Sequence, residues 1–116
     1  MDPWYAFGTE DMLEVAHMAI HFGRLVSDKR KEQVFDGITY GGARTLGLDN
    51  YGLEKGCNAD MVVLQARDPM EAVRLKATRL FVIRRGKVIA KSAPSIAEVF
   101  LGDHNTTVDF SRESTP

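Results

Sequence analysis

Apolar residues in the first half of the chain recur at helical spacing. Between Met12 and Val26 they fall on more than one side of a helix, which predicts a helix over about residues 10–26 that is covered on several sides. Thr9 precedes this stretch and is a suitable N-cap, because acidic residues follow it in the first turn. The pattern therefore predicts a first helix that is largely enclosed.

A polar, charged segment over residues 27–31 predicts a break after this helix. Apolar residues at helical spacing then predict a second helix over residues 32–39. Thr39 is a candidate cap for a short third helix over residues 42–46, which Gly47 ends. The first half of the chain is thus predicted to be helical.

From residue 59 onward the pattern changes to runs of consecutive apolar and β-branched residues. These runs predict strands over residues 61–64, 80–83 and 88–90, and a further strand over residues 98–101. Arg85 and Gly86 predict a hairpin turn between the second and third strands. Asp68 and Pro69 predict the start of a short helix between the first and second strands. The polar residues 102–116 predict a loose tail.

The predicted strands are apolar at consecutive positions, which is typical of strands that are covered on both faces. Three or four such strands and three helices have too little apolar surface to cover one another twice over. We therefore expect the chain to pack against another chain or to form part of a larger protein.

Length and charge exclude several classes of protein. The chain has 116 residues, whereas a complete (β/α)₈ barrel needs roughly 250. Its 15 basic and 16 acidic residues give a net charge of -1, with no positive excess for binding nucleic acid or an anionic membrane. The single cysteine, Cys57, excludes an internal disulfide and indicates a cytoplasmic protein. Apolar runs stay far below the roughly 20 residues of a membrane span, and the N-terminus lacks a signal-peptide pattern.

Four blocks of the chain match the C-terminal signature of a known enzyme family. They are ARTLGL at 43–48, YGLEKG at 51–56, NADMVVL at 58–64 and FVIRRGKVI at 81–89. Their residues and spacing resemble the amidohydrolase superfamily. The N-terminal block, Asp-Pro-Trp-Tyr at 2–5 followed by Gly-Thr and His-Met pairs, is similar to metal-dependent cytosine deaminases of the bacterial type.

The resemblance implies an α+β fold that forms the C-terminal quarter or so of such an enzyme. Residues 1–57 are expected to supply the terminal helices of a (β/α)₈ barrel, which is incomplete in this chain. Residues 58–101 are expected to supply antiparallel strands and the final hairpin of the amidohydrolase β-sandwich, a composite domain, and residues 102–116 a polar tail.

The resemblance also implies a chemistry, the hydrolysis of carbon–nitrogen bonds in cyclic amidines by a water bound to a divalent metal, zinc or iron. The family's metal ligands and proton-shuttling residues lie upstream of the matched blocks, and Asp2 does not match the metal-binding aspartate. Trp4 matches a position that helps to wall the pyrimidine pocket. We therefore expect no catalytic residue and no metal ligand in this chain, and no activity from it alone.

Two histidines and a glutamate offer a different interpretation. Glu14, His17 and His21 would share one face of the first helix at a spacing that zinc sites use. The alternative is that one or both histidines hydrogen-bond a neighbouring loop or partner. We favour the second interpretation, because the helix is apolar around these residues and no fourth ligand is evident.

Other short motifs have a chemical and a structural interpretation as well. Glycines at 41–42, after Tyr40, could bind an anion at the start of a helix or simply join two elements. Cys57 could be a reactive thiol or a packed small side chain. The basic groups at 29–31 and 84–87 are typical of solvated surface residues. The structural interpretation is favoured for all of them.

Two functions remain open from the sequence. The first is the C-terminal segment of a cytosine-deaminase-like amidohydrolase, which would act on a pyrimidine-like substrate only in a complete enzyme whose barrel strands come from a complementing chain. The second is a structural module derived from such an enzyme, which associates with itself as a homo-oligomer by strand exchange.

Overall fold

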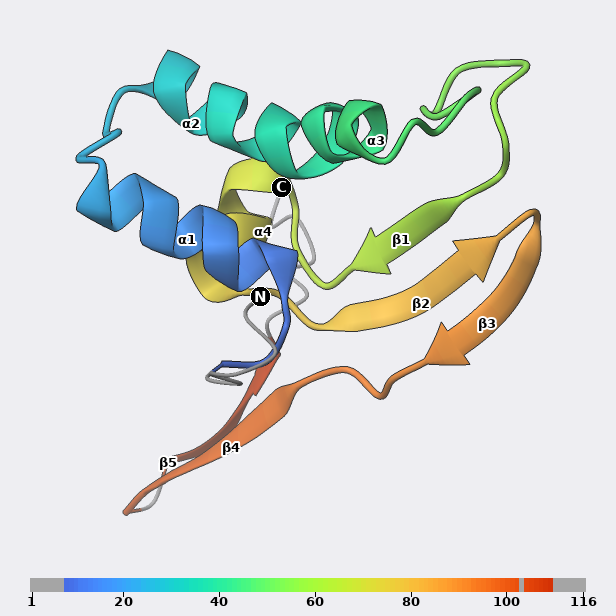
Figure 1. The fold of residues 1–116 in the computed structure, drawn as a ribbon. Coiled ribbons are helices and arrows are strands. Elements are labelled where there is room, and N and C mark those ends of the chain that lie inside the picture. The colour runs from blue at the N-terminus through green and yellow to red at the C-terminus, as the bar shows by residue number, and fades with distance from the viewer. Residues whose placement is uncertain (1–7, 103, 110–116) are drawn as a thin grey trace.

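The computed structural model describes residues 8–102 and 104–109, in which a helical layer packs beside a small antiparallel sheet (Figure 1). The helices are α1 (Met12–Phe22), α2 (Asp28–Asp36), the π-helix η1 (Gly37–Gly41), α3 (Gly42–Thr45) and α4 (Pro69–Leu75). Helix α4 contacts both α1 and α2, so it joins the helical layer to the strands that flank it in sequence. Within the described residues, no helix has the length and apolar character that crossing a membrane requires.

Helix α1 is shorter than the sequence predicts at both ends. Asp11, not Thr9, is the N-cap: its side chain accepts a hydrogen bond from the Leu13 amide at 2.7 Å. The helix ends at Phe22, because Gly23 is the C-cap and Arg24 has a left-handed backbone with φ of 49°. The prediction of a helix reaching residue 26 was therefore wrong for its last turn.

The predicted break at 27–31 is also wrong for most of its length. Ser27 precedes α2 and Asp28 lies in its first turn, so the charged residues begin a helix instead of separating two. Helices α2, η1 and α3 follow one another without interruption from residue 28 to residue 45. Thr39 lies inside this segment, where its hydroxyl donates to the Phe35 carbonyl at 2.9 Å, and it caps no helix.

The predicted strands and hairpin turn form a three-stranded antiparallel sheet in the order β1-β2-β3. The strands are β1 (Met61–Leu64), β2 (Arg79–Arg84) and β3 (Lys87–Lys91). Arg85 and Gly86 connect β2 to β3 with φ of 48° and 76°, the two positive values that a tight hairpin turn of this length requires. The short helix between β1 and β2 is confirmed too, since the Asp68 side chain caps α4 and Pro69 is its first residue.

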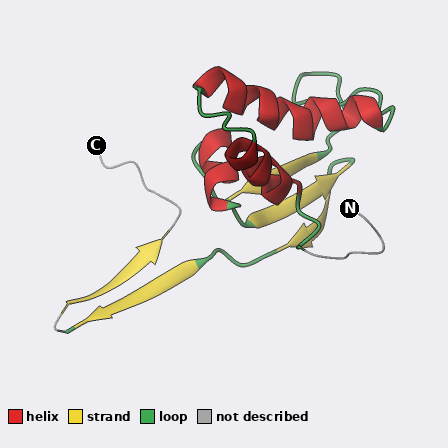
Figure 2. Cartoon of the chain, turned by 60° about the vertical axis from the view of Figure 1, so that its left-hand side comes forward, coloured by secondary structure: helices red, strands yellow, loops and turns green. Residues whose placement is uncertain are grey.

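The C-terminal strands form a separate hairpin that projects away from the rest of the fold (Figure 2). Strand β4 (Ile96–Leu101) pairs antiparallel with β5 (His104–Asp109). The prediction of a loose tail is therefore wrong for residues 104–109. Their polar composition concealed a β-branched run, Thr-Thr-Val, which favours a strand.

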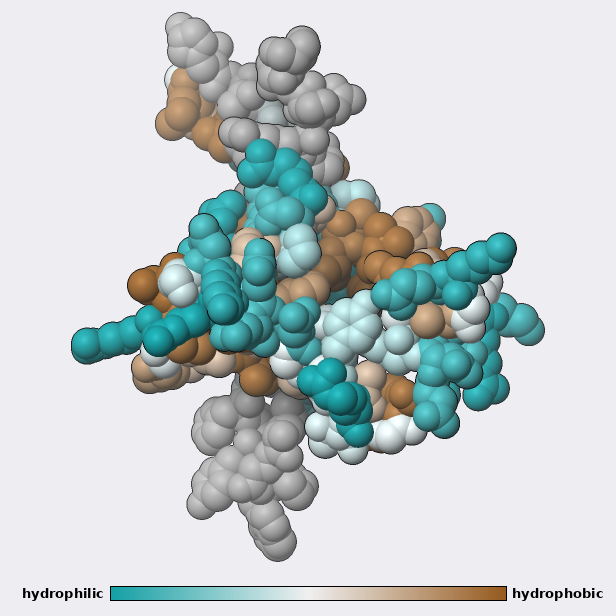
Figure 3. Space-filling view, turned by 90° about the horizontal axis from the view of Figure 1, so that it is seen from above, coloured by the Kyte–Doolittle hydropathy of each residue, from teal (hydrophilic) through white to brown (hydrophobic). Residues whose placement is uncertain are grey.

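The core lies between α1 and α4 and is small. Six hydrophobic residues are buried among those described, and four of them are alanines; the two larger ones are Leu13 and Val73. The accessible surface of 9542 Å² exceeds the about 6,300 Å² that a compact chain of 12.9 kDa exposes. Much of β1 and all of β3 are exposed, and apolar side chains reach the surface in several places (Figure 3). This chain thus leaves uncovered the strands whose sequence is typical of two-sided burial.

Candidate functional site

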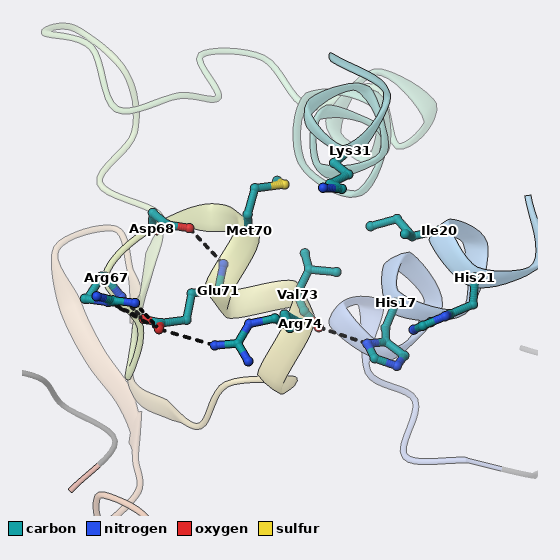
Figure 4. Close-up of a pocket in the computed structure, with 10 residues that line it drawn as sticks. All are labelled: His17, Ile20, His21, Lys31, Arg67, Asp68, Met70, Glu71, Val73 and Arg74. Carbon is teal, nitrogen blue, oxygen red and sulfur yellow. Dashed lines mark hydrogen bonds and ion pairs between the residues drawn. The ribbon is translucent and has the colours of Figure 1, made fainter. Parts of the chain in front are cut away.

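A hollow of about 380 Å³ opens where α1, α2 and α4 meet (Figure 4). Its wall includes His17 and His21 from α1, Lys31 from α2, and Glu71 and Arg74 from α4. These are the kinds of side chain that could hold an ion or transfer a proton. The hydrogen-bond and ion-pair partners of these side chains determine which chemistry the hollow can support.

The alternative metal interpretation of Glu14, His17 and His21, which the sequence disfavoured, does not match the contacts of these side chains. Nδ1 of His17 lies 3.3 Å from the Val73 carbonyl oxygen, to which it donates, and the two imidazole rings are 4.5 Å apart. Glu14 accepts from the amide and hydroxyl of Thr9 at 3.1 and 2.9 Å, and these bonds lower the pKa of Glu14. In the part of the chain that the structure describes, no group of three or more His, Cys, Asp or Glu side chains comes together to hold a metal ion. These residues do not fit the family's metal.

The carboxylate of Glu71 is the most strongly held charge in the hollow. Arg67 donates to it from its backbone amide at 2.8 Å and from its guanidinium at 2.8 and 3.2 Å. Arg74 lies 3.5 Å away on the same helix. Hydrogen bonds from Arg67 lower the pKa of Glu71 from 4.5 to about 2. At neutral pH this carboxylate is therefore an ion-pair partner and not a proton carrier.

The low pKa of Glu71 predicts a specific loss of stability in acid. The folded-state pKa lies below the unfolded value, so the stabilisation is complete above about pH 4.5 and is lost as pH falls toward 2. We expect urea denaturation to give Glu71→Gln a lower free energy of unfolding than the unmodified chain at pH 6, with the difference shrinking toward pH 2. A difference that stays constant between pH 6 and pH 2 would contradict this assignment.

A second ion pair joins the start of α1 to the sheet. The Arg79 guanidinium donates to the Asp11 carboxylate at 2.8 Å, and these two residues are 68 positions apart. The hydrogen bond from Arg79 lowers the pKa of Asp11 and raises that of Arg79. Asp11 therefore acts as helix cap and ion-pair partner at once.

The glycine motif has the structural role that the sequence favoured. Residues 41 and 42 lie inside the continuous helical segment, so they do not present the free amides of a helix N-terminus. The half-buried Cys57 thiol donates to the Glu54 carboxylate at 3.6 Å. The Tyr40 ring packs edge-on against that of Tyr51, with centroids 5.6 Å apart. Trp4, the predicted pocket wall, lies outside the described residues.

Sequence reasoning missed the polar contacts that organise this region. The spacing of Arg67 and Glu71, four residues apart, was a usable signal for an ion pair at the start of a helix. Nothing in the sequence pointed to Asp11 with Arg79. The same holds for Gln65, whose buried amide accepts from the Ser95 amide at 2.8 Å and donates to the Ser95 carbonyl at 3.0 Å. Glu71 pairs with Arg67 and Arg74 at the hollow, and Lys31 pairs with Asp28, which is the arrangement of a structural network.

The fold is thus a mixed helix and antiparallel-strand unit with uncovered apolar strands and a hollow in which charged side chains form ion pairs. The chain belongs to the amidohydrolase family, whose profile matches residues 1–91.

Its relatives are amidohydrolases and deaminases. The chain is 37% identical over 97 residues to N-isopropylammelide isopropyl amidohydrolase of Pseudomonas sp. (strain ADP), covering 83% of this chain and 24% of that enzyme. It is 32% identical over 99 residues to pterin deaminase of Rhizobium rhizogenes (strain K84), covering 84% and 22%. It superposes on 5-methylcytosine deaminase of Klebsiella pneumoniae liganded with 5-fluorocytosine with a TM-score of 0.72 and 36% identity, over 81% of this chain and 23% of that one. The chain therefore spans about a quarter of the length of these relatives.

Proposed function

We propose that this chain is the C-terminal segment of a cytosine-deaminase-like amidohydrolase, which hydrolyses a carbon–nitrogen bond of a cyclic amidine. One observation carries the proposal. The chain matches 5-methylcytosine deaminase at 36% identity and a TM-score of 0.72 over most of its own length, yet it corresponds to less than a quarter of that enzyme. The proposed enzyme is cytosolic, in keeping with a single cysteine, Cys57.

The proposed role of this segment is to support the site and not to perform the chemistry. Its carboxylates at positions 11 and 71 are held in ion pairs, and Glu14, His17 and His21 do not fit a metal ion. The resemblance places the metal ligands and acid–base residues in the upstream barrel. We therefore propose that the chain alone has no deaminase activity and gains a role in catalysis only beside a complementing barrel.

The uncovered apolar surface supports this need for a complementing barrel. Large apolar side chains are exposed on α1, in the connection between α3 and β1, and on the sheet. Among the most exposed are Phe22, Leu46 and Leu53, at 80%, 74% and 80%. Exposed apolar surface on this scale marks interaction sites, and a complementing barrel is the partner proposed here for α1 and the α3–β1 connection.

The substrate proposed is a pyrimidine or related ring that carries an exocyclic nitrogen. Trp4 is proposed to wall its pocket, on the resemblance of the Asp-Pro-Trp-Tyr block to cytosine deaminases. The relatives named for N-isopropylammelide and pterin act on other substrates, so the test of the substrate includes isopropylammelide.

A chimeric enzyme tests the proposal. The C-terminal quarter of Klebsiella 5-methylcytosine deaminase, to which this chain is proposed to correspond, would be replaced by residues 1–116. We expect the purified chimera to bind its metal and to release ammonia from 5-methylcytosine. A folded, metal-loaded chimera without turnover on cytosine, 5-methylcytosine or isopropylammelide would contradict the proposal.

A substitution at Trp4 in the same chimera tests the proposed pocket role of this residue. If this residue walls the pocket, Trp4→Ala should raise KM for the pyrimidine at least several-fold while metal content stays constant, because truncation removes contact with the ring and no metal ligand. Replacement of the exposed Glu32 by Ala should change neither quantity. Equal kinetics for the two variants would exclude Trp4 from the pocket.

A further inference from the structure

We propose that the β4–β5 hairpin is an arm that docks along strand β3 of a second copy of this chain. The hairpin extends from the body and pairs only within itself among the described residues (Figures 1 and 2). A two-stranded hairpin is marginally stable on its own in water. Ile96, Phe100 and Leu101 are nonetheless 57%, 71% and 67% exposed on it. Such an arm needs a surface to cover these side chains.

The part of the chain that matches the amidohydrolase profile does not include the arm. The match ends at residue 91, which is the last residue of β3, and β4 begins at Ile96. The arm lies outside this family match, although the alignments with the two relatives, which cover 83% and 84% of the chain, extend into the start of β4. This inference is independent of the proposed function.

Strand β3 offers the receiving surface. It pairs with β2 on one side, and no described strand pairs with its other edge. Val88 and Ile89 are 58% and 61% exposed on this strand, so it presents apolar side chains as well as free backbone groups. An edge of this kind accepts an added strand from another chain.

The arm cannot reach this edge within its own chain. Beyond β3, the Ser92 amide still donates to the Leu80 carbonyl of β2 at 3.1 Å. Three residues later, Ser95 is held through both its amide and its carbonyl by the buried side chain of Gln65, which follows β1. The chain has therefore crossed the end of the sheet, and β4 leaves from the β1 side. The outer edge of β3 is on the opposite side of the sheet.

Charge selects β3 as the partner of the arm. Residues 96–109 contain three acidic residues, Glu98 among them, and no Lys or Arg. Residues 84–91, the end of the β2–β3 hairpin, contain four basic residues and no acidic one.

The pairing register places positive charge on both faces of this edge. Lys91 pairs with Phe81 and Lys87 pairs with Arg84, with a bulge at Ile89 between them, so the two lysines lie on opposite faces. The edge lysines repel the lysines of a second β3 strand, and the bulge disfavours regular pairing with it. They attract the acidic arm of another copy, and a reciprocal exchange would close a two-fold dimer.

A charge swap tests the arm directly. Sedimentation or light scattering of the full chain should give a dimer, of twice 12.9 kDa, that weakens with added salt. Glu98→Lys should weaken dimerisation at least about tenfold, and so should Lys87→Glu with Lys91→Glu, because each places like charges in contact. Mixing these two variants should restore a one-to-one dimer, since both of its contacts again join opposite charges.

The control carries the same charge change away from the arm. Glu32→Lys on the exposed surface of α2 should leave the dimer unchanged, and circular dichroism should show all variants equally folded. A wild-type chain that stays monomeric at every attainable concentration would overturn the proposal. So would a dimer that Glu98→Lys does not weaken, which would assign self-association to another apolar surface, or a mixture of the two variants that remains monomeric.

Discussion

Replacing Leu13 with Ala is expected to lower the free energy of unfolding by about 3 kcal/mol. Leu13 is 4% exposed and packs with Val73 in a core whose other buried apolar members are alanines. Replacing its isobutyl group with a methyl group leaves a cavity that such small neighbours cannot fill. Since domains are stable by only about 5–15 kcal/mol, this one change should remove a large fraction of the total.

The same substitution at Leu53 is the matched control. Leu53 is 80% exposed, so Leu53→Ala should change the stability of the isolated chain by less than about 0.5 kcal/mol. Urea denaturation of both variants measures the contrast. Equal losses, or a loss at Leu13 no larger than at Leu53, would show that the core does not lie between α1 and α4.

Replacing Asp11 with Ala is expected to cost about 2–3 kcal/mol, because it removes a helix cap and one partner of a partly buried ion pair. The side chain of Asp11 is 17% exposed and that of Arg79 is 35% exposed. Arg79 would be left without its carboxylate in a half-buried position. Chemical denaturation at pH 7 gives the size of the loss.

Asp11→Asn separates the two contributions. Asparagine can still accept from the Leu13 amide but carries no charge, so it should keep the cap and lose the ion pair. Arg79 lowers the pKa of Asp11, and the ion-pair contribution is therefore present above the ordinary value of 3.8 and is lost as pH falls below it. The advantage of the unmodified chain over Asp11→Asn should disappear in strong acid. If Asp11→Asn equals Asp11→Ala at pH 7, the cap contributes nothing.

The elements that the sequence predicted well depend on local chemistry. Asp68 and Pro69 start α4, and Arg85 with Gly86 turns β2 into β3, because caps and tight turns need particular residues at particular positions. The prediction of Thr9 as the α1 cap was wrong, because Thr9 and Asp11 are both good caps. Asp11 also pairs with Arg79, a contact between distant positions that a local pattern does not reveal.

The features that the sequence did not predict depend on distant contacts. The pairing of Gln65 with Ser95 joins positions 30 residues apart and uses a side chain with no distinctive local signal. Strand β5 is polar, so alternation of apolar residues could not reveal it. The metal interpretation of Glu14, His17 and His21 rested on spacing along one helix. In the structure, Glu14 instead accepts a hydrogen bond from Thr9, and His17 donates one to the carbonyl of Val73.

Ammonia release in the presence of added zinc or iron is the decisive measurement. It is made on the purified chain alone, and on the chain mixed with the upstream three quarters of Klebsiella 5-methylcytosine deaminase. The chain by itself should bind no stoichiometric metal and release no ammonia from cytosine or 5-methylcytosine, whereas the mixture should turn over. Stoichiometric metal together with turnover by the chain alone would contradict its assignment as a supporting segment.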